Sequence, residues 1–221
     1  SHRLANRLVG NPEEAATLEM TLNGPALKFR TDAVIALAGA EMPAKLDGEP
    51  VPFWVAVEVK RDQTLELGQV AGAGQRAYLA VRHGFDAPVY LGSRSAFTLG
   101  RFGGHAPGAL RTGDVLRINR EGATGEPVAE PLPQSARTPL TREWEIATLY
   151  GPHGAPDFFL DEDIETLFNT AYEVHYNSAR TGVRLIGPKP KWARKDGGEA
   201  GLHPSNIHDN AYAVGTVDFT G

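Results

Sequence analysis

The chain has 221 residues and a formal net charge of −5, and it contains no cysteine. The lack of cysteine excludes disulfides, thiolate nucleophiles and thiolate metal ligands, and it fits a cytoplasmic protein. The acidic balance provides no broad basic surface for nucleic acid, and the longest apolar run, residues 33–40, is too short to span a bilayer. We therefore expect neither a nucleic-acid partner nor a membrane partner.

The first 120 residues have the pattern of many short strands. Residues 1–9 have helical spacing, and Asn11-Pro12-Glu13-Glu14 is a helix start signal in which Asn11 would be the cap. From residue 17 the apolar period changes to two, and Asp47-Gly48 is typical of a hairpin turn. The predicted strands are 18–22, 27–29, 34–38, 55–59, 64–67, 76–81 and 114–118. With 25 glycines and 16 prolines at no fixed period, this pattern predicts a mainly β fold (β-rich α+β) of the barrel or sandwich type.

Two segments interrupt this pattern. Residues 82–113 lose the alternation, and a loop of this length inside a compact domain is more often functional than structural. Residues 121–138 are rich in Pro, Gly, Ala and Glu without an apolar period, which is typical of a linker. We therefore divide the chain into a first lobe at 1–120, a linker at 121–138 and a second lobe at 139–221. In the second lobe the pattern predicts a helix at 161–168 and strands at 144–150, 172–176, 183–186 and 213–219.

Residues 72–77 fit the loose glycine fingerprint of dinucleotide-binding proteins. That motif needs a helix N-terminus after its glycines, whereas a β-type segment follows here. A structural turn is the better interpretation.

Residues 196–209 are the most informative stretch, because they combine glycine, proline and polar residues with almost nothing apolar. Loops of this composition present polar groups to ligands. Asn206 stands out, since its amide offers one acceptor and two donors, the complement of a small urea-like or amide-like solute. His203, His208 and Asp209 could also be imagined as metal ligands, but their spacing across Pro204 does not put both rings on one helical face. We expect no metal, and structural hydrogen bonding remains the alternative to a polar site.

Other polar residues allow more than one interpretation. No Gly-x-Ser-x-Gly nucleophile elbow is present, and the nearest serine cluster, residues 92–95, is either a turn or part of a site. Several cations beside glycine or proline suit an anionic group such as a carboxylate, although each is more commonly a solvated surface charge. These cations are Arg94, Lys189, Lys191 and Arg194.

Four motifs together resemble the carboxyltransferase domain of biotin-dependent urea carboxylase, in the superfamily of allophanate hydrolase subunit 2 and KipA-like proteins. They are residues 3–12 (RLANRLVGNP), 76–81 (RAYLAV), 91–95 (LGSRS) and, most specific to urea carboxylase, 197–210 (GGEAGLHPSNIHDN). The resemblance covers nearly the whole chain and implies two cyclophilin-like β-barrel lobes with the site between them. Because family members have further segments at both ends, we expect the second lobe to be incomplete.

The resemblance also implies a reaction, the transfer of a carboxyl group from carboxybiotin to a urea nitrogen, which gives allophanate. Biotin would be carried on a separate biotin carboxyl carrier domain, and ATP would be used only at a separate biotin carboxylase domain. Allophanate hydrolase is a further expected partner.

Site roles follow from the same resemblance and from the composition of the loop. The catalytic residues would be Asn206, His203 and His208. The substrate-binding residues would be Asn206, Ser205, Asp209, Glu199, Arg94 and Ser93. Asn206 would hold urea through its amide, while Glu199 and Asp209 would orient the histidines or the loop. An aspartate at position 206 would instead favour a cationic guanidine substrate.

Two alternatives remain, one within the same superfamily and one from a different class of protein. The same superfamily contains a 5-oxoprolinase subunit and KipA-like regulators, against which the Asn-Ile-His-Asp sequence at 206–209 argues. The other alternative is a non-catalytic module that only docks a carrier domain.

Overall fold

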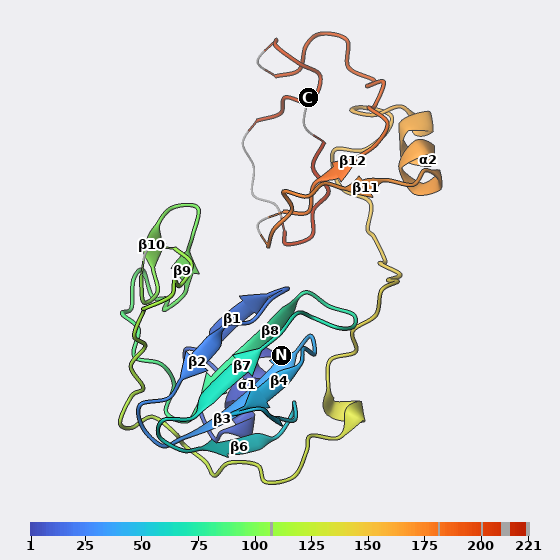
Figure 1. Cartoon of the computed structure of the whole chain (residues 1–221). Coiled ribbons are helices and arrows are strands. Elements are labelled where there is room, and N and C mark those ends of the chain that lie inside the picture. Colours follow the sequence, from blue (N-terminus) through green and yellow to red (C-terminus); the bar gives the residue numbers. More distant parts are fainter. Residues whose placement is uncertain (107, 181, 200, 209–212, 220–221) are drawn as a thin grey trace. The chain divides into compact units, whose positions relative to one another are not determined.

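The computed structural model describes residues 1–106, 108–180, 182–199, 201–208 and 213–219. The chain forms two compact units, Ser1–Trp144 and Glu145–Gly221 (Figure 1). The predicted mainly β fold class is confirmed, because antiparallel sheets account for most of the regular structure. The division into lobes at 1–120 and 139–221 with a linker between them stays a prediction.

Two four-stranded antiparallel sheets form the first unit. The first has the order β1-β8-β3-β6 and contains β1 (Leu18–Thr21), β8 (Arg76–Val81), β3 (Ala33–Gly39) and β6 (Ala56–Val59). The second has the order β2-β7-β4-β5 and contains β2 (Ala26–Lys28), β7 (Thr64–Leu67), β4 (Ala44–Leu46) and β5 (Glu49–Pro50). In the described part of the chain each sheet keeps two edge strands, so the pairing does not close either one into a barrel.

The main core lies between these two sheets. Its buried side chains come from strands of both sheets and from the segments between them: Met20, Ile35, Leu37, Met42, Ala44, Val59, Leu65, Leu67, Ala77, Leu79 and Val81. Each strand contributes alternate residues to this layer, as the period of two requires. Burial of the larger of these side chains, those of Met, Ile, Leu and Val, stabilises the unit by roughly 1.5–3 kcal/mol each relative to leaving them exposed.

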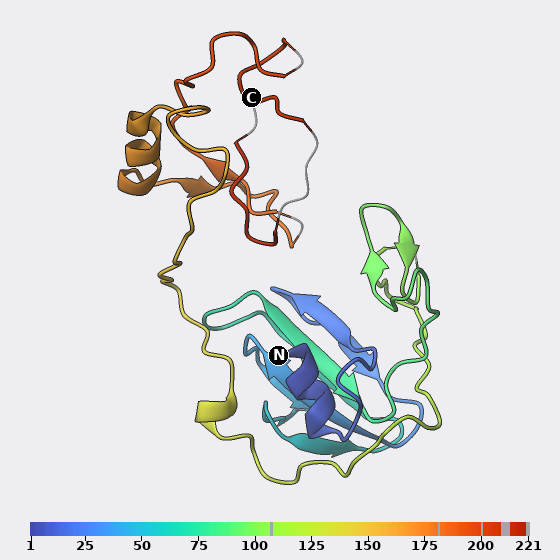
Figure 2. The same ribbon diagram turned by 180° about the vertical axis from the view of Figure 1, so that it is seen from behind.

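Helix α1 (His2–Leu8) covers the other face of the first sheet, and Figure 2 shows it from that side. Leu8 packs there against Ala36, Ala38 and Ala80, all of which are buried. The small alanine side chains let the helix approach the strands closely. Strand β3 is therefore covered on both faces, which explains why its sequence is an unbroken apolar run without alternation.

The turn after α1 corrects one prediction. No helix begins at Asn11, because residues 11–12 have no regular structure and residues 13–14 form a turn. Asn11 is instead buried, and its Nδ2 donates to Val81 O (2.8 Å) and to Asn6 Oδ1 (3.1 Å). Its Oδ1 accepts a hydrogen bond from the backbone N–H of His83 (2.8 Å). The Asn11 side chain thus provides hydrogen-bond partners for the backbone groups at the end of β8, and it does not cap a helix.

The Asp47-Gly48 hairpin is confirmed, and both residues have positive φ, 49° and 93°, as a type I′ turn requires. The predicted strand at 114–118 is wrong, since within it only Ile118 pairs, in an isolated bridge to Phe85. The long segment predicted as a loop contains two very short paired strands, β9 (Ala96–Phe97) and β10 (Phe102–Gly103). The glycine-rich residues 72–75 contain bends and lead directly into β8 without a helix, which agrees with the interpretation as a structural segment.

Residues 121–138 lie along the first unit and include a short 3₁₀ helix, η1 (Gln134–Ala136). The backbone N–H groups of Gly125, Val128 and Leu132 donate to Gly10 O, Leu8 O and Trp54 O at 3.0, 2.8 and 2.7 Å. The guanidinium of Arg137 lies 5.6 Å from the ring centroid of the buried Trp54. These contacts hold residues 121–138 against α1 and against the segment that precedes β6.

The second unit has little regular structure. It contains α2 (Asp161–Asn169), close to the predicted helix, and one antiparallel pair, β11 (Glu173–Val174) with β12 (Leu185–Ile186). The predicted strands at 144–150 and 213–219 are wrong, because the described residues there form no ladder. All described residues of this unit are at least partly exposed. Polar contacts and aromatic packing therefore hold it together more than a buried aliphatic core does.

None of the helices in the described residues is long and apolar enough to cross a membrane.

Candidate functional site

We define the polar loop as residues 196–208 apart from residue 200; Asp209 lies outside the described residues. Two adjacent glycines shape its start, since Gly197 and Gly198 have φ of 85° and 74°. A Cβ atom on Gly198 would lie 2.3 Å from His203 O and 2.8 Å from Asn206 O. The loop therefore closes directly onto Gly198, and only a residue without a side chain leaves room for this contact.

A tight turn at 203–206 presents the predicted site residues. The Asn206 N–H donates to His203 O (2.9 Å), which closes the turn. The Ser205 N–H donates to His203 Nδ1 (3.2 Å), and Ser205 Oγ lies 2.8 Å from the same nitrogen. Because Nδ1 accepts a hydrogen bond, the neutral ring carries its proton on Nε2, which leaves that N–H available as a donor.

Asn206 is held by its main chain. Its carbonyl oxygen accepts hydrogen bonds from the Glu199 N–H (3.1 Å) and from Arg194 Nη1 (3.2 Å). Within the described residues, none of the hydrogen bonds involves its side-chain amide, which is half-buried. A fixed backbone with an uncommitted amide is the arrangement that a small hydrogen-bonding ligand requires.

Glu199 connects a cation to a histidine. Its Oε1 lies 3.1 Å from Arg194 Nη2, and its Oε2 lies 3.2 Å from His208 Nε2. The imidazole of His208 is otherwise largely exposed. The carboxylate therefore orients this ring at the open side of the loop.

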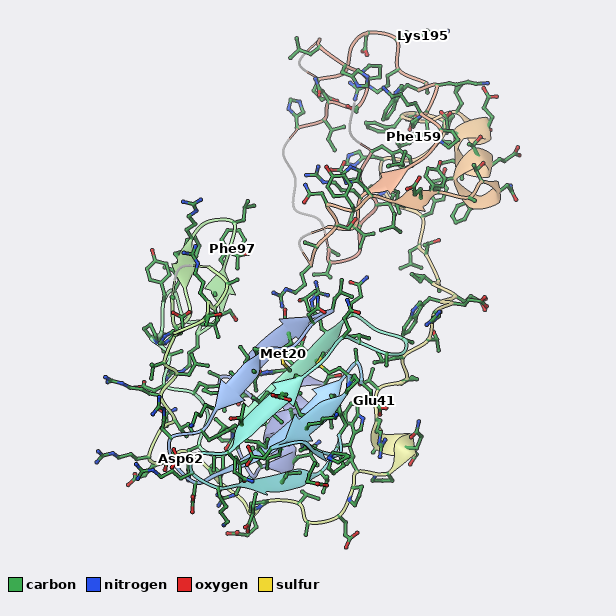
Figure 3. All side chains as sticks on the ribbon, viewed as in Figure 1. Met20, Glu41, Asp62, Phe97, Phe159 and Lys195 are labelled. Carbon is green, nitrogen blue, oxygen red and sulfur yellow. The ribbon has the colours of Figure 1, made fainter. Side chains whose placement is uncertain are left out.

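Aromatic side chains pack against the polar loop. Trp192 meets the His203 ring edge to face at 5.6 Å and lies 5.0 Å from the Phe159 ring. In Figure 3 Phe159 lies inside the second unit, whereas Lys195 lies at its outer edge. The position of His203 thus depends on where Trp192 is held.

Helix α2 fixes Trp192 through Asp163. The carboxylate of Asp163 accepts hydrogen bonds from three backbone N–H groups, those of Leu160 (3.0 Å), Lys191 (2.8 Å) and Trp192 (3.2 Å). An acid in the first turn of a helix interacts favourably with the helix dipole. Asp163 in addition joins the helix to the segment before the polar loop.

Asp163→Asn is expected to destabilise the second unit by about 2 kcal/mol, because an amide has one acceptor oxygen fewer and leaves a donor unsatisfied. The measurement is the denaturant concentration at the midpoint of unfolding of the 221-residue chain, monitored by the near-UV circular dichroism of tryptophan. Asp161→Asn is the matched control, since it removes the same charge from the same turn, where the dipole alone is worth about 0.3–1 kcal/mol. Equal shifts for the two variants would contradict the role given to Asp163.

Ser93 and Arg94, the other predicted site residues, belong to the first unit. Ser93 pairs with Tyr90 through backbone hydrogen bonds, and its Oγ accepts from the Ser95 N–H at 3.1 Å. Arg94 Nη1 donates to Ala87 O. The structure therefore brings Glu199, His203, Ser205, Asn206 and His208 together in one loop, and it gives Ser93 and Arg94 structural contacts in their own unit.

Two of the cations suggested for anion binding are engaged by protein carboxylates. Lys191 Nζ lies 2.8 Å from Glu162, whose carboxylate raises the pKa of this lysine. The guanidinium of Arg194 contacts Glu199 and, at 3.8 Å, Asp196. In the sequence, Arg194 stands just before a glycine-rich loop that contains acids, and this signal could have indicated the pairing.

Two open pockets lie in the first unit, with volumes of about 420 and 340 Å³. Both are lined by Glu41, Trp54 and Arg137, and neither contains a predicted site residue. The described residues contain no group of three or more His, Asp or Glu side chains placed to hold a metal ion.

Comparison with known proteins identifies the family. The family model described as "Carboxyltransferase domain, subdomain A and B" matches residues 1–221. This chain belongs to that carboxyltransferase family. The resemblance to the carboxyltransferase domain of urea carboxylase, inferred from the four motifs, is thereby confirmed.

Individual relatives agree with this carboxyltransferase assignment. The urea amidolyase of Saccharomyces cerevisiae is 50% identical over 225 residues, which cover 100% of this chain and 12% of that protein. The crystal structure of the Kluyveromyces lactis urea carboxylase superposes with a TM-score of 0.89 at 48% identity, covering 100% of this chain and 20% of that one. A 5-oxoprolinase subunit of Escherichia coli is 39% identical over 118 residues, 53% of this chain and 38% of that protein. The chain thus spans a small part of the urea amidolyase and urea carboxylase chains that it matches over its whole length.

Proposed function

We propose that this carboxyltransferase domain transfers a carboxyl group from carboxybiotin to a nitrogen of urea, giving allophanate and biotin, while the proton of that urea nitrogen passes to the biotin nitrogen that loses the carboxyl group. The observation that supports the substrate is the side-chain amide of Asn206, which forms no hydrogen bond within the described residues and stands on a fixed backbone in the same loop as His203, Ser205 and His208. The likeness to urea amidolyase and urea carboxylase over the whole chain supports the reaction. The likeness to a 5-oxoprolinase subunit extends over about half of the chain.

The donor and acceptor set of the polar loop fits a neutral, planar amide. The Asn206 amide offers its oxygen to a urea N–H and its NH₂ to the urea carbonyl, which fixes the orientation of the molecule. The Nε2–H of His203 supplies a further neutral donor for a carbonyl oxygen. Urea nitrogen is a weak nucleophile, so the contribution of these residues is positioning and the stabilisation of charge on oxygen.

Carboxybiotin supplies the activated carboxyl group when it is bound. Because the Asn206 amide is assigned to urea, the Nε2–H of His203 is the donor that would face the ureido oxygen of biotin, and a neutral donor suits an oxygen on which charge develops as the carboxyl group leaves. We further propose that biotin is delivered by a biotin carboxyl carrier domain and that ATP is used at a biotin carboxylase domain. The relatives named urea amidolyase are much longer than this chain, which leaves room for such domains and for an allophanate hydrolase.

Asn206→Asp is expected to lower kcat/KM for urea by about 30-fold and to raise it for guanidine. The carboxylate loses the two N–H donors that hold the urea carbonyl, and it pairs with a guanidinium through charge-assisted hydrogen bonds worth about 1.5–3 kcal/mol. The measurement is carboxylation of each substrate by the complete biotin-dependent polypeptide that carries this domain. Asn177→Asp, which adds the same charge at an exposed position of the same unit, should leave both values unchanged.

The same assay separates the competing functions. Unchanged selectivity in Asn206→Asp would remove Asn206 from the substrate site. If the intact polypeptide forms no allophanate from carboxybiotin and urea, the proposed reaction is wrong, and a docking module or a different amide substrate takes its place.

A further inference from the structure

Beside the polar loop lies the charged residue Arg194, whose side chain is only 14% exposed. Phe158 covers one face of the guanidinium, with its ring centroid 5.2 Å from Cζ. The nitrogens of Arg194 face the protein: Nη1 donates to Asn206 O, Nη2 pairs with Glu199, and Nε lies 3.8 Å from Asp196. This cation is therefore placed to organise protein groups and not to contact a substrate.

We propose that Arg194 is a positioning residue of the carboxyltransferase site, which sets where the Asn206 amide and the His208 ring stand. This inference rests on the proposed function of the polar loop. Arg194 Nη1 donates a hydrogen bond to the carbonyl oxygen of Asn206 at 3.2 Å. Arg194 acts on His208 indirectly, because Glu199 pairs with both side chains. One rigid planar group thus determines the separation of two groups that face the ligand.

The planar fork of the guanidinium is essential to this role. Its two Nη atoms reach a backbone carbonyl and a carboxylate at the same time, at 3.2 and 3.1 Å. Lysine keeps the positive charge but concentrates it on one nitrogen, so it cannot hold both groups in the same plane. The second unit has no fully buried residue among those described, so little aliphatic packing compensates for the loss of this anchor.

A double-mutant cycle in the complete biotin-dependent polypeptide tests the inference. Asn206→Ala is expected to lower kcat/KM for urea by about 100-fold, and Arg194→Lys by about 10-fold, because misplacement of a substrate-holding group by about 1 Å costs up to about 10²-fold. If Arg194 acts through Asn206, adding Arg194→Lys to Asn206→Ala should reduce kcat/KM by less than about 3-fold further, since coupled residues are not additive. A merely structural role would lower activity by the same factor in both backgrounds, and that result would overturn the proposal.

Two further measurements make the outcome decisive. Arg184→Lys, the same substitution at an exposed arginine of the same unit, should leave kcat/KM unchanged. A crystal structure of Arg194→Lys should show Asn206 and Glu199 displaced from their positions in the parent; an unmoved loop would overturn the proposal whatever the kinetics. If Asn206→Ala alone has no effect on urea turnover, the proposed substrate site is wrong. The crystal structure of Arg194→Lys still tests separately whether Arg194 holds Asn206 and Glu199 in place.

If Arg194→Lys does not fold, Glu199→Gln provides the second variant. It keeps the shape of the side chain and removes the charge that pairs with both Arg194 and His208. Its loss of activity should shrink in a background that carries both Asn206→Ala and His208→Ala, because both positioned groups are then missing. A loss of equal size in the parent and in that background would again contradict the positioning role.

Discussion

Gly198→Ala is expected to lower kcat/KM for urea by about 100-fold in the complete enzyme. The added Cβ would lie 2.3 Å from His203 O, 2.8 Å from Asn206 O and 3.1 Å from Asn206 Cβ. Two of these atoms belong to the backbone, so no side-chain rotation relieves the contact. The turn that presents the Asn206 amide must move away, and a displacement of about 1 Å is enough to cost about 100-fold in rate.

Gly201→Ala is the matched control for this prediction. Gly201 belongs to the same loop and has φ of 67°, close to the 74° of Gly198, but a Cβ there would meet no atom within 4 Å. Alanine at either position meets the left-handed penalty of about 1–2 kcal/mol. Only Gly198→Ala adds the clash with the turn, so it should lose about ten times more activity than the control. Equal losses would show that the contact between Gly198 and the turn does not position the site.

Asn6→Ala is expected to destabilise the chain by about 3 kcal/mol. Asn6 is fully buried, and its Nδ2 donates to Ala15 O (2.8 Å) and to Glu13 O (3.2 Å), while its Oδ1 accepts from Asn11 Nδ2 (3.1 Å). Truncation removes the partner of two carbonyls and of one amide donor. A buried polar group without a partner costs about 1–3 kcal/mol, and Asn11 keeps part of its bonding through Val81 O.

Denaturant unfolding of the 221-residue chain measures this effect. The exposed Asn23 provides the control, because Asn23→Ala removes the same atoms from a surface position and should shift stability by less than about 0.5 kcal/mol. Asn6 and Asn11 share one network, so the double variant Asn6→Ala with Asn11→Ala should lose less than the sum of the two single variants. A loss below about 1 kcal/mol for Asn6→Ala would mean that solvent enters the turn and replaces the missing partner.

The same two asparagines show why local signals misled the prediction at this turn. Asn11 followed by Pro12 satisfies every local rule for a helix start. Nothing nearby in the sequence indicates that its side chain is needed 70 residues away, at Val81 O. Tertiary hydrogen bonding therefore overrode a local capping preference.

The failed strands have a related cause. Residues 114–118, 144–150 and 213–219 have strand-like composition, yet in the described residues they pair in no ladder, and only Ile118 forms a bridge. A strand exists only when another strand offers its hydrogen-bonding edge, which is a non-local condition. By contrast, β3 and β8 were predictable because their apolar character reflects burial that nearly any β fold would give them.

By itself, the sequence determined the mainly β class, helix α1 and the Asp47-Gly48 hairpin, and it predicts the polar loop as the place of the chemistry. These follow from periodicity, turn preferences and composition, all of which act over a few residues. Only the tertiary structure decided that Asp163, Trp192 and Arg194 hold that loop, and that among the described residues the Asn206 carbonyl accepts hydrogen bonds while its side-chain amide forms none. Which groups a side chain meets depends on how distant segments pack, and no short window of residues contains that information.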